Sequence, residues 1–198
     1  MALSAISYFL MQSTDVLFIS AYDTFESVAY YSIAVKLATV TALALISVNI
    51  VIAPKIASIY NDKNFSQLKL ILKKATRINV VISLPIIILL LLFSEYVLST
   101  FGSNYILAKN ALWILLIAQF FNSITGPSAL YLNMTGRQKK LNVILVTSLL
   151  INVVLNIILV PALGMLGAAI STTTSFVISK ILASALVFYL DNVKTFIS

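Results

Sequence analysis

The chain has 198 residues, of which 61% are hydrophobic and only 10% are charged. Soluble domains carry about 25% charged residues, so this composition indicates a membrane protein. The sequence has no Cys and no His, which excludes disulfides, thiolate chemistry, His-based acid–base catalysis and most zinc sites.

The net charge of +7 comes mainly from Lys and Arg placed beside apolar segments. This placement is typical of the cytoplasmic face of a membrane protein, and it lacks the aromatic–basic interleaving of a nucleic-acid platform. Only six carboxylates are present, and none forms a close pair in the sequence. We therefore expect membrane lipid as a partner, no nucleic acid, no enzyme activity, no metal and no cofactor.

Six apolar stretches are long enough to cross a bilayer core, which takes about 20 residues of helix. They predict an all-α polytopic membrane protein whose residues 1–198 form a single six-helix lobe. The predicted spans are residues 2–20, 28–52, 80–99, 108–132, 143–160 and 166–190.

The loops between these spans alternate in charge. The first, residues 21–27, holds two acids and no base, whereas the second, residues 55–77, holds six bases and one acid. The fourth, residues 135–140, holds three bases and no acid. The positive-inside rule places the second and fourth loops in the cytoplasm, together with both termini. The predicted location is the cytoplasmic (inner) membrane.

Within the second loop, residues 65–77 alternate apolar and basic side chains at helical spacing. Leu68, Leu72 and Ala75 can form one side of a helix, with three basic side chains opposite. The pattern fits an amphipathic helix on the anionic inner leaflet. It fits a solvated basic connector equally well.

The first two spans carry charges at membrane depth. Gln12 and Asp15 share one sector of the first helix, and Lys36 lies on a polar face of the second. Such charges are costly unless they face a cavity or a partner. Asp15 and Lys36 lie at similar depth and can pair across the hairpin. Two interpretations stay open: a cavity-lining pair for a proton, a cation or an anionic head group, and a buried ion pair that fixes helix register.

Amide side chains mark the fourth and fifth spans. Gln119 and Asn122 share a face of the fourth, and Asn152 and Asn156 share a face of the fifth. Amides in membranes often bond one helix to another. Hydrogen bonding to a substrate is the alternative.

The sixth span combines a charge with a ridge of small residues. Lys180 faces either a cavity or, by snorkelling, the inner interface. The ridge predicts close packing of another helix more strongly than it predicts a ligand site. Its members lie four residues apart: Gly167, Ser171, Ser175 and Ser179.

Residues 152–172 read NVVLNIILVPALGMLGAAIST. This stretch resembles the LN..L.P..G..GAA..T signature of O-antigen flippases (Wzx-type) of the polysaccharide transporter family. That family lies within the multidrug/oligosaccharidyl-lipid/polysaccharide (MOP) superfamily. Residues 15–20, 26–37, 101–105 and 132–139 resemble further family segments in the same order, so the resemblance covers nearly the whole chain.

The resemblance implies the C-terminal half of a flippase for lipid-linked oligosaccharides, such as O-antigen, capsule or exopolysaccharide repeat units. Members usually have two six-helix lobes around a central cavity. By that resemblance, Lys36 and Lys180 supply positive charge for a lipid pyrophosphate, and Asp15 takes part in coupling to H⁺ or Na⁺. The chain has the length of one lobe. We therefore expect a second six-helix lobe as partner, with the chain being a fragment, half of a split transporter or a homodimerising lobe.

Two other functions fit the sequence. One is a lobe of a small-molecule exporter of the multidrug (MATE) type, against which the predicted cationic cavity argues. The other is a non-transporting membrane scaffold in polysaccharide assembly, with the ridge on the sixth span as its interface.

Overall fold

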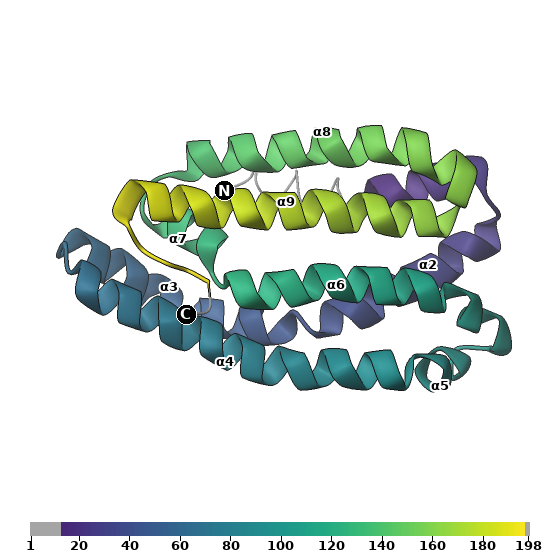
Figure 1. Cartoon of the computed structure of the whole chain (residues 1–198), viewed down its shortest axis with the longest axis horizontal. Helices are drawn as coiled ribbons and strands as arrows, with labels where there is room; N and C mark the ends of the chain where they lie inside the picture. The colour runs from purple at the N-terminus through teal and green to yellow at the C-terminus, as the bar shows by residue number, and fades with distance from the viewer. Residues whose placement is uncertain (1–12, 197–198) are drawn as a thin grey trace.

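The computed structural model describes residues 13–196, and in that range the secondary structure is entirely helical. The long helices lie side by side along the longest axis of the molecule (Figure 1). A first helix is described over residues 13–22. The others are α2 (Phe25–Val40), α3 (Leu43–Asn61), α4 (Phe65–Leu92), α5 (Ser94–Ser99), the 3₁₀ helix η1 (Ser103–Ala108), α6 (Lys109–Thr125), α7 (Ser128–Met134), α8 (Gln138–Leu163) and α9 (Met165–Asp191).

Five helical segments of the described residues are long and apolar enough to cross a membrane. This confirms the predicted all-α membrane class. Most of the first predicted span, residues 2–20, lies outside the described residues, as does Gln12. The five segments are Leu43–Asn61, Phe65–Leu92, Ser103–Thr125, Gln138–Leu163 and Met165–Asp191.

The second predicted span, residues 28–52, is not one helix. It breaks at Thr41–Ala42 into α2 and α3, and α3 continues to Asn61. The Thr41 hydroxyl donates to the carbonyl of Ala38 over 2.7 Å, a local bond that competes with the helical ladder. The Thr41 carbonyl accepts from Ser83 of α4 over 3.1 Å, so a neighbouring helix satisfies the broken turn.

The predicted amphipathic helix over residues 65–77 is not a separate element. It is the first part of α4, which continues to Leu92, because no Gly or Pro interrupts residues 65–84. The predicted apolar side is buried: Leu68 and Leu72 are 0% exposed and Ala75 is 2% exposed. These side chains pack with α3, in a buried cluster that also includes residues of α7 and α9, rather than lying on a bilayer surface. The third predicted span, residues 80–99, ends at Phe93, before the short helix α5.

The fourth predicted span, residues 108–132, breaks at Gly126–Pro127, between α6 and α7. Gly126 has a φ of 61°, and a Cβ there would lie 2.2 Å from the Thr76 hydroxyl and 2.6 Å from the Thr195 carbonyl oxygen. The Thr76 hydroxyl donates to that same carbonyl over 2.7 Å. Residues 192–196 therefore fold back from the end of α9 onto this break (Figure 1).

Helices α8 and α9 form a tight antiparallel hairpin over nearly the range predicted for the last two spans. Pro161 lies in the last turn of α8, and Gly164 follows with a φ of 56°. A Cβ on Gly167 would lie 2.4 Å from the carbonyl oxygen of Leu159. Only a glycine permits this approach, so the GxxG turn fixes how α9 lies against α8.

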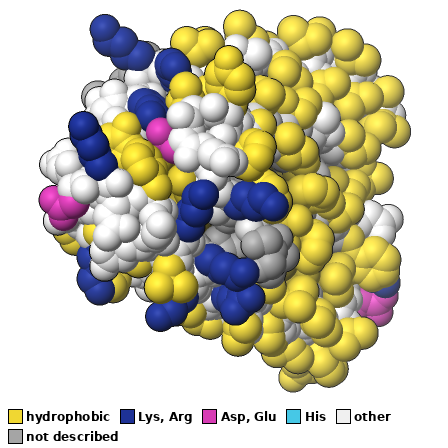
Figure 2. Space-filling view, turned by 60° about the vertical axis from the view of Figure 1, so that its left-hand side comes forward, with side chains coloured by type: hydrophobic (Ala, Val, Ile, Leu, Met, Phe, Trp, Pro, Cys, Tyr) yellow, Lys and Arg dark blue, Asp and Glu magenta, His cyan; other side chains and the backbone are white. Residues whose placement is uncertain are grey.

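The loops fall at the two ends of the bundle as their charges predict. The loop between α3 and α4 and the loop between α7 and α8 lie at the same end, beside the end of α9 (Figure 1). Lys and Arg side chains gather there (Figure 2), and we call it the basic end. The acidic first loop lies at the opposite end, where the Asp23 carboxylate approaches the Gly164 turn.

Candidate functional site: a buried carboxylate

Four helices bring polar side chains together around Asp15. The first helix supplies Asp15 and α2 supplies Tyr31. Asn152 and Asn156 lie one turn apart on the same face of α8, and α9 supplies Thr172. We call these five residues the Asp15 cluster.

Each partner donates a hydrogen bond to the Asp15 carboxylate. The Tyr31 hydroxyl donates to Oδ2 over 2.6 Å, and the Thr172 hydroxyl donates to the same oxygen. Oδ1 accepts from Asn156 Nδ2 over 2.9 Å and from Asn152 Nδ2 over 3.4 Å. The carboxylate is thus held by four neutral donors from three other helices.

The two amides also bond within the cluster. Asn152 Nδ2 donates to Thr172 Oγ1 over 3.0 Å, and its Oδ1 accepts from Asn156 Nδ2 over 3.2 Å. Asn156 Oδ1 is buried with no hydrogen-bond partner among the described residues. The Asn156 nitrogen, and not this oxygen, faces the Asp15 carboxylate, so an unpartnered amide oxygen lies in the cluster on the side away from that contact.

The cluster is deeply buried and carries one unbalanced acidic group. Asp15 is 1% exposed, and Asn152 and Asn156 are 0% exposed. Tyr31 and Thr172 lie about 10 Å from the N-terminal ends of their helices, at a rise of about 1.5 Å per residue. Burying an unpaired carboxylate is costly even when it is hydrogen-bonded. A proton or a small cation bound here would remove that cost.

The predicted pairing of Asp15 with Lys36 is wrong. Lys36 is exposed, on the side of α2 opposite the buried Tyr31, Ala34 and Ala38. Within residues 13–196 the ion pairs are Lys109–Glu95 and Arg137–Asp191, and neither involves Asp15 or Lys36. The polar face predicted for Lys36 points outward because neighbouring helices cover the other side of α2.

Lys180 lies away from the cluster. It is eight residues beyond Thr172 on α9, about 12 Å farther toward the basic end. Its ammonium lies 5.0 Å from the centre of the Phe176 ring on the same helix. This cation–π contact offsets part of the cost of a half-buried charge, and it places Lys180 outside the Asp15 cluster.

Gln119 and Asn122 are buried, but they belong to a second polar group around the helix breaks. Asn122 Nδ2 donates to Gln119 Oε1 over 3.2 Å on α6. Asn79 of α4 donates to the Ser123 carbonyl over 3.1 Å, and this bond joins α4 to α6. The Ser83 hydroxyl has one proton, which it shares between the Thr41 carbonyl and Asn79 Oδ1, at 3.1 and 3.2 Å.

The small residues of α9 are buried, and their hydroxyls bond to their own helix. Ser171 donates to the Gly167 carbonyl and Ser175 to the Ser171 carbonyl, each over 2.8 Å. Ser179 donates to the Phe176 carbonyl over 2.7 Å. Because these donors are already used, the ridge presents a small surface rather than free polar groups.

A clamp at the basic end joins four helices, α3, α7, α8 and α9. Arg137 donates two hydrogen bonds to the Asp191 carboxylate, one of them over 2.8 Å, and a third to the Tyr60 hydroxyl over 3.0 Å. The Tyr131 hydroxyl donates to Asp191 over 2.6 Å. The hydrogen bonds to Asp191 raise the pKa of Arg137, so this cation stays charged at any physiological pH.

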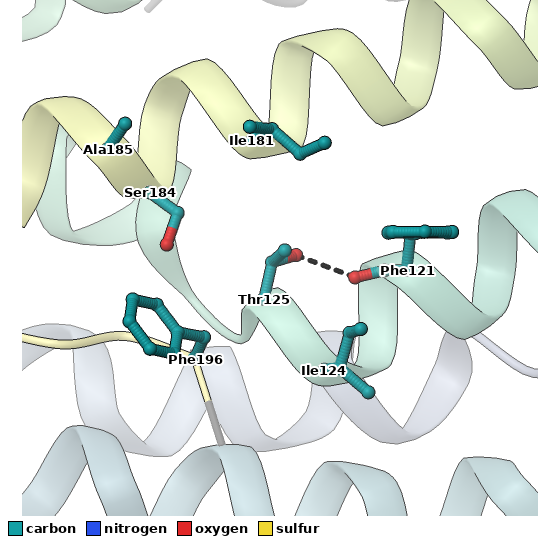
Figure 3. A pocket seen from close by; sticks show the side chains of 7 residues that line it. All are labelled: Phe121, Ile124, Thr125, Ile181, Ser184, Ala185 and Phe196. Atoms are coloured by element: carbon teal, nitrogen blue, oxygen red, sulfur yellow. Dashed lines mark hydrogen bonds between the residues drawn. The ribbon is translucent and has the colours of Figure 1, made fainter. Parts of the chain in front are cut away.

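An apolar cavity of about 370 Å³ lies between α6, α9 and the C-terminal segment (Figure 3). Its lining contains no charged side chain, and none of it belongs to the Asp15 cluster. The cavity therefore offers shape and apolar contact but no charge. Its lining residues are Phe121, Ile124, Thr125, Ile181, Ser184, Ala185 and Phe196.

Sequence reasoning missed several members of these polar groups. Tyr31 and Thr172 lie inside the quoted flippase-like segments, yet no pattern in the sequence marks their hydroxyls as members of a buried polar cluster. Asn79 and Ser83 form an i, i+4 polar pair inside an apolar span, which was the available sign of a buried network.

Comparison with known proteins adds a family to this geometry. The MatE family model matches residues 1–158. The chain is 27% identical over 183 residues to a protein of Haloferax volcanii named "Probable low-salt glycan biosynthesis flippase Agl15", covering 90% of this chain and 38% of the relative. It is 30% identical over 159 residues to a Shigella flexneri protein named "Putative O-antigen transporter", covering 79% and 37%.

The chain thus spans less than two-fifths of the length of these two relatives. No solved structure matches it. The names of both relatives agree with the resemblance carried by residues 152–172.

Proposed function

Since the chain belongs to the MatE family, we propose that it forms a membrane lobe of a flippase that moves lipid-linked oligosaccharides across the cytoplasmic membrane. The observation that carries this proposal is the Asp15 cluster: a buried carboxylate held by neutral donors, in a chain whose relatives are named as glycan transporters. Nothing in this proposal requires catalysis of a covalent step.

The Asp15 cluster is the proposed site of ion coupling. A transporter driven by an ion gradient needs a group whose occupancy by a proton or Na⁺ favours one conformation over another. Four helices meet at Asp15, so occupancy there can alter how they pack. If Asn156 turns its amide, its carbonyl oxygen joins Asp15 and Thr172 in an oxygen-rich site that suits a small cation.

A second lobe is the proposed partner, because one bundle alone cannot enclose a central cavity. Lys36 is exposed on α2, which packs against the candidate membrane helix α6, and an uncovered charge facing lipid is costly. A facing lobe would place Lys36 in a polar cavity, where its charge suits a lipid pyrophosphate. The basic end is the proposed cytoplasmic end.

The test removes the gene from the cell that makes the protein and restores it from a plasmid. A flippase lobe predicts that deletion abolishes surface glycan while the lipid-linked precursor accumulates inside, and that the plasmid reverses both changes. Normal surface glycan in the deletion strain would overturn the proposal.

A small-molecule exporter remains the second candidate, because the exposed Lys36 and the distant Lys180 leave the Asp15 cluster without a cation. A buried carboxylate without that cation also suits a cationic cargo. Loss of cationic-dye efflux in the deletion strain, with normal surface glycan, would favour this candidate over the flippase.

A further inference from the structure

An open groove runs between α8 and α9 on the outer surface at the basic end. It has a volume of about 550 Å³. Val143 and Ile144 line it from α8, and Leu182 and Leu186 line it from α9. Lys140 is the charged side chain of the lining. The other lining side chains are apolar or aromatic.

The groove is positioned at the edge of the membrane-spanning region. Lys140 lies in the first turn of α8, three residues after Arg137, whose ion pair with Asp191 fixes this end of the hairpin. Tyr189, in the last turn of α9, also lines the groove and is 85% exposed. Tyr is typical of the interface between lipid tails and head groups.

The Lys140 ammonium has no carboxylate partner within residues 13–196, because neither ion pair of that range involves it. The unpaired cation suits the phosphate of an anionic phospholipid, and the apolar groove suits its acyl chain. Basic pockets between membrane helices on the cytoplasmic side are suited to such head groups.

We propose that this groove binds an anionic phospholipid of the inner leaflet, with its phosphate at Lys140 and an acyl chain between α8 and α9. The observation that selects this occupant is charge complementarity at the rim combined with exposed apolar walls. The proposal rests on the membrane placement of the chain and on the proposed cytoplasmic position of the basic end, and it is independent of which cargo the protein carries.

The test titrates the purified full chain in detergent micelles with phosphatidylglycerol and counts bound lipid by native mass spectrometry. Lys140→Ala should weaken binding about fivefold, the equivalent of about 1 kcal/mol for one basic side chain near an anionic surface. Lys139→Ala is the matched control, since Lys139 is an exposed neighbour outside the groove lining. It should leave binding unchanged.

A second variant tests the tail site without altering charge. Val143 is an exposed groove residue that does not line the cavity of Figure 3, so Val143→Trp should fill the groove and weaken binding, whereas Val154→Trp, exposed elsewhere on α8, should not. Phosphatidylcholine and glycerol 3-phosphate should bind at least fivefold more weakly than phosphatidylglycerol. Equal losses in Lys139→Ala and Lys140→Ala, no effect of Val143→Trp, or equal binding of either comparison compound would overturn the proposal.

Discussion

At the scale of residues, the distinguishing feature is a carboxylate surrounded by neutral donors. Hydrogen bonds to a charged group contribute about 1.5–3 kcal/mol each, and the loss of one leaves a buried oxygen unsatisfied. The Tyr31 hydroxyl donates one of these hydrogen bonds, to Asp15 Oδ2 over 2.6 Å. Its hydroxyl is the donor best placed to hold Asp15 against α2.

Tyr31→Phe removes that donor and keeps the ring. We expect a loss of about 1–3 kcal/mol in the free energy of unfolding, measured by denaturation of the purified protein in detergent. Tyr22→Phe is the control, because Tyr22 is 59% exposed. Equal stability of the two variants would show that the Tyr31 hydroxyl contributes nothing to the Asp15 cluster.

At the scale of elements, the distinguishing features are the two breaks between consecutive helices. The break between α2 and α3 lies at Thr41, whose carbonyl is satisfied by Ser83 of α4. The break between α6 and α7 lies at Gly126, against Thr76 and residue 195 of the C-terminal segment. Both breaks therefore lie against α4, which bonds to one of them through Ser83 and approaches the other through Thr76.

Ser83→Ala leaves the Thr41 carbonyl without its donor. We expect a loss of about 1 kcal/mol in stability and faster amide hydrogen exchange around residues 40–43. Ser66→Ala provides the control, since Ser66 is exposed on the same helix. Unchanged exchange at residues 40–43 in Ser83→Ala would contradict the role assigned to this contact.

At the scale of the whole molecule, the two ends differ in charge, and this difference gives the proposed orientation. The chain has no Cys, so single cysteines report on accessibility without background. Asn64→Cys at the basic end should react with a membrane-impermeant thiol reagent only after the cells are opened. Ser103→Cys at the opposite end should react in intact cells, and the reverse labelling pattern would invert the proposed topology.

The sequence was informative about depth and periodicity and uninformative about how helices face one another. Asp15, Asn152 and Asn156 could be selected because polar residues at membrane depth need partners. Their hydrogen-bond partners could not be predicted, because a helical wheel shows which residues share a face of one helix but not how that helix is rotated relative to the next. That limit explains why Lys36 was paired with Asp15 although it lies on the exposed side of α2.

The break between α2 and α3 could not be predicted, for a related reason. Thr41–Ala42 contains neither Gly nor Pro, and its break depends on a hydrogen bond from α4, which is distant in sequence. The continuation of α4 from Phe65 to Leu92 was missed because basic residues in its first half indicated an interfacial segment. Burial of Leu68 and Leu72 in a cluster with α3 decided that outcome.

The measurement that tests the central claim most directly is glycan export in cells whose only copy of the protein carries Asp15→Asn. This change removes the carboxylate charge and keeps a similar shape. Asp62→Asn is the matched control, because Asp62 is an exposed carboxylate beyond α3. At equal protein levels, surface glycan should fall at least tenfold in Asp15→Asn and stay normal in Asp62→Asn. Normal export by Asp15→Asn would contradict the account.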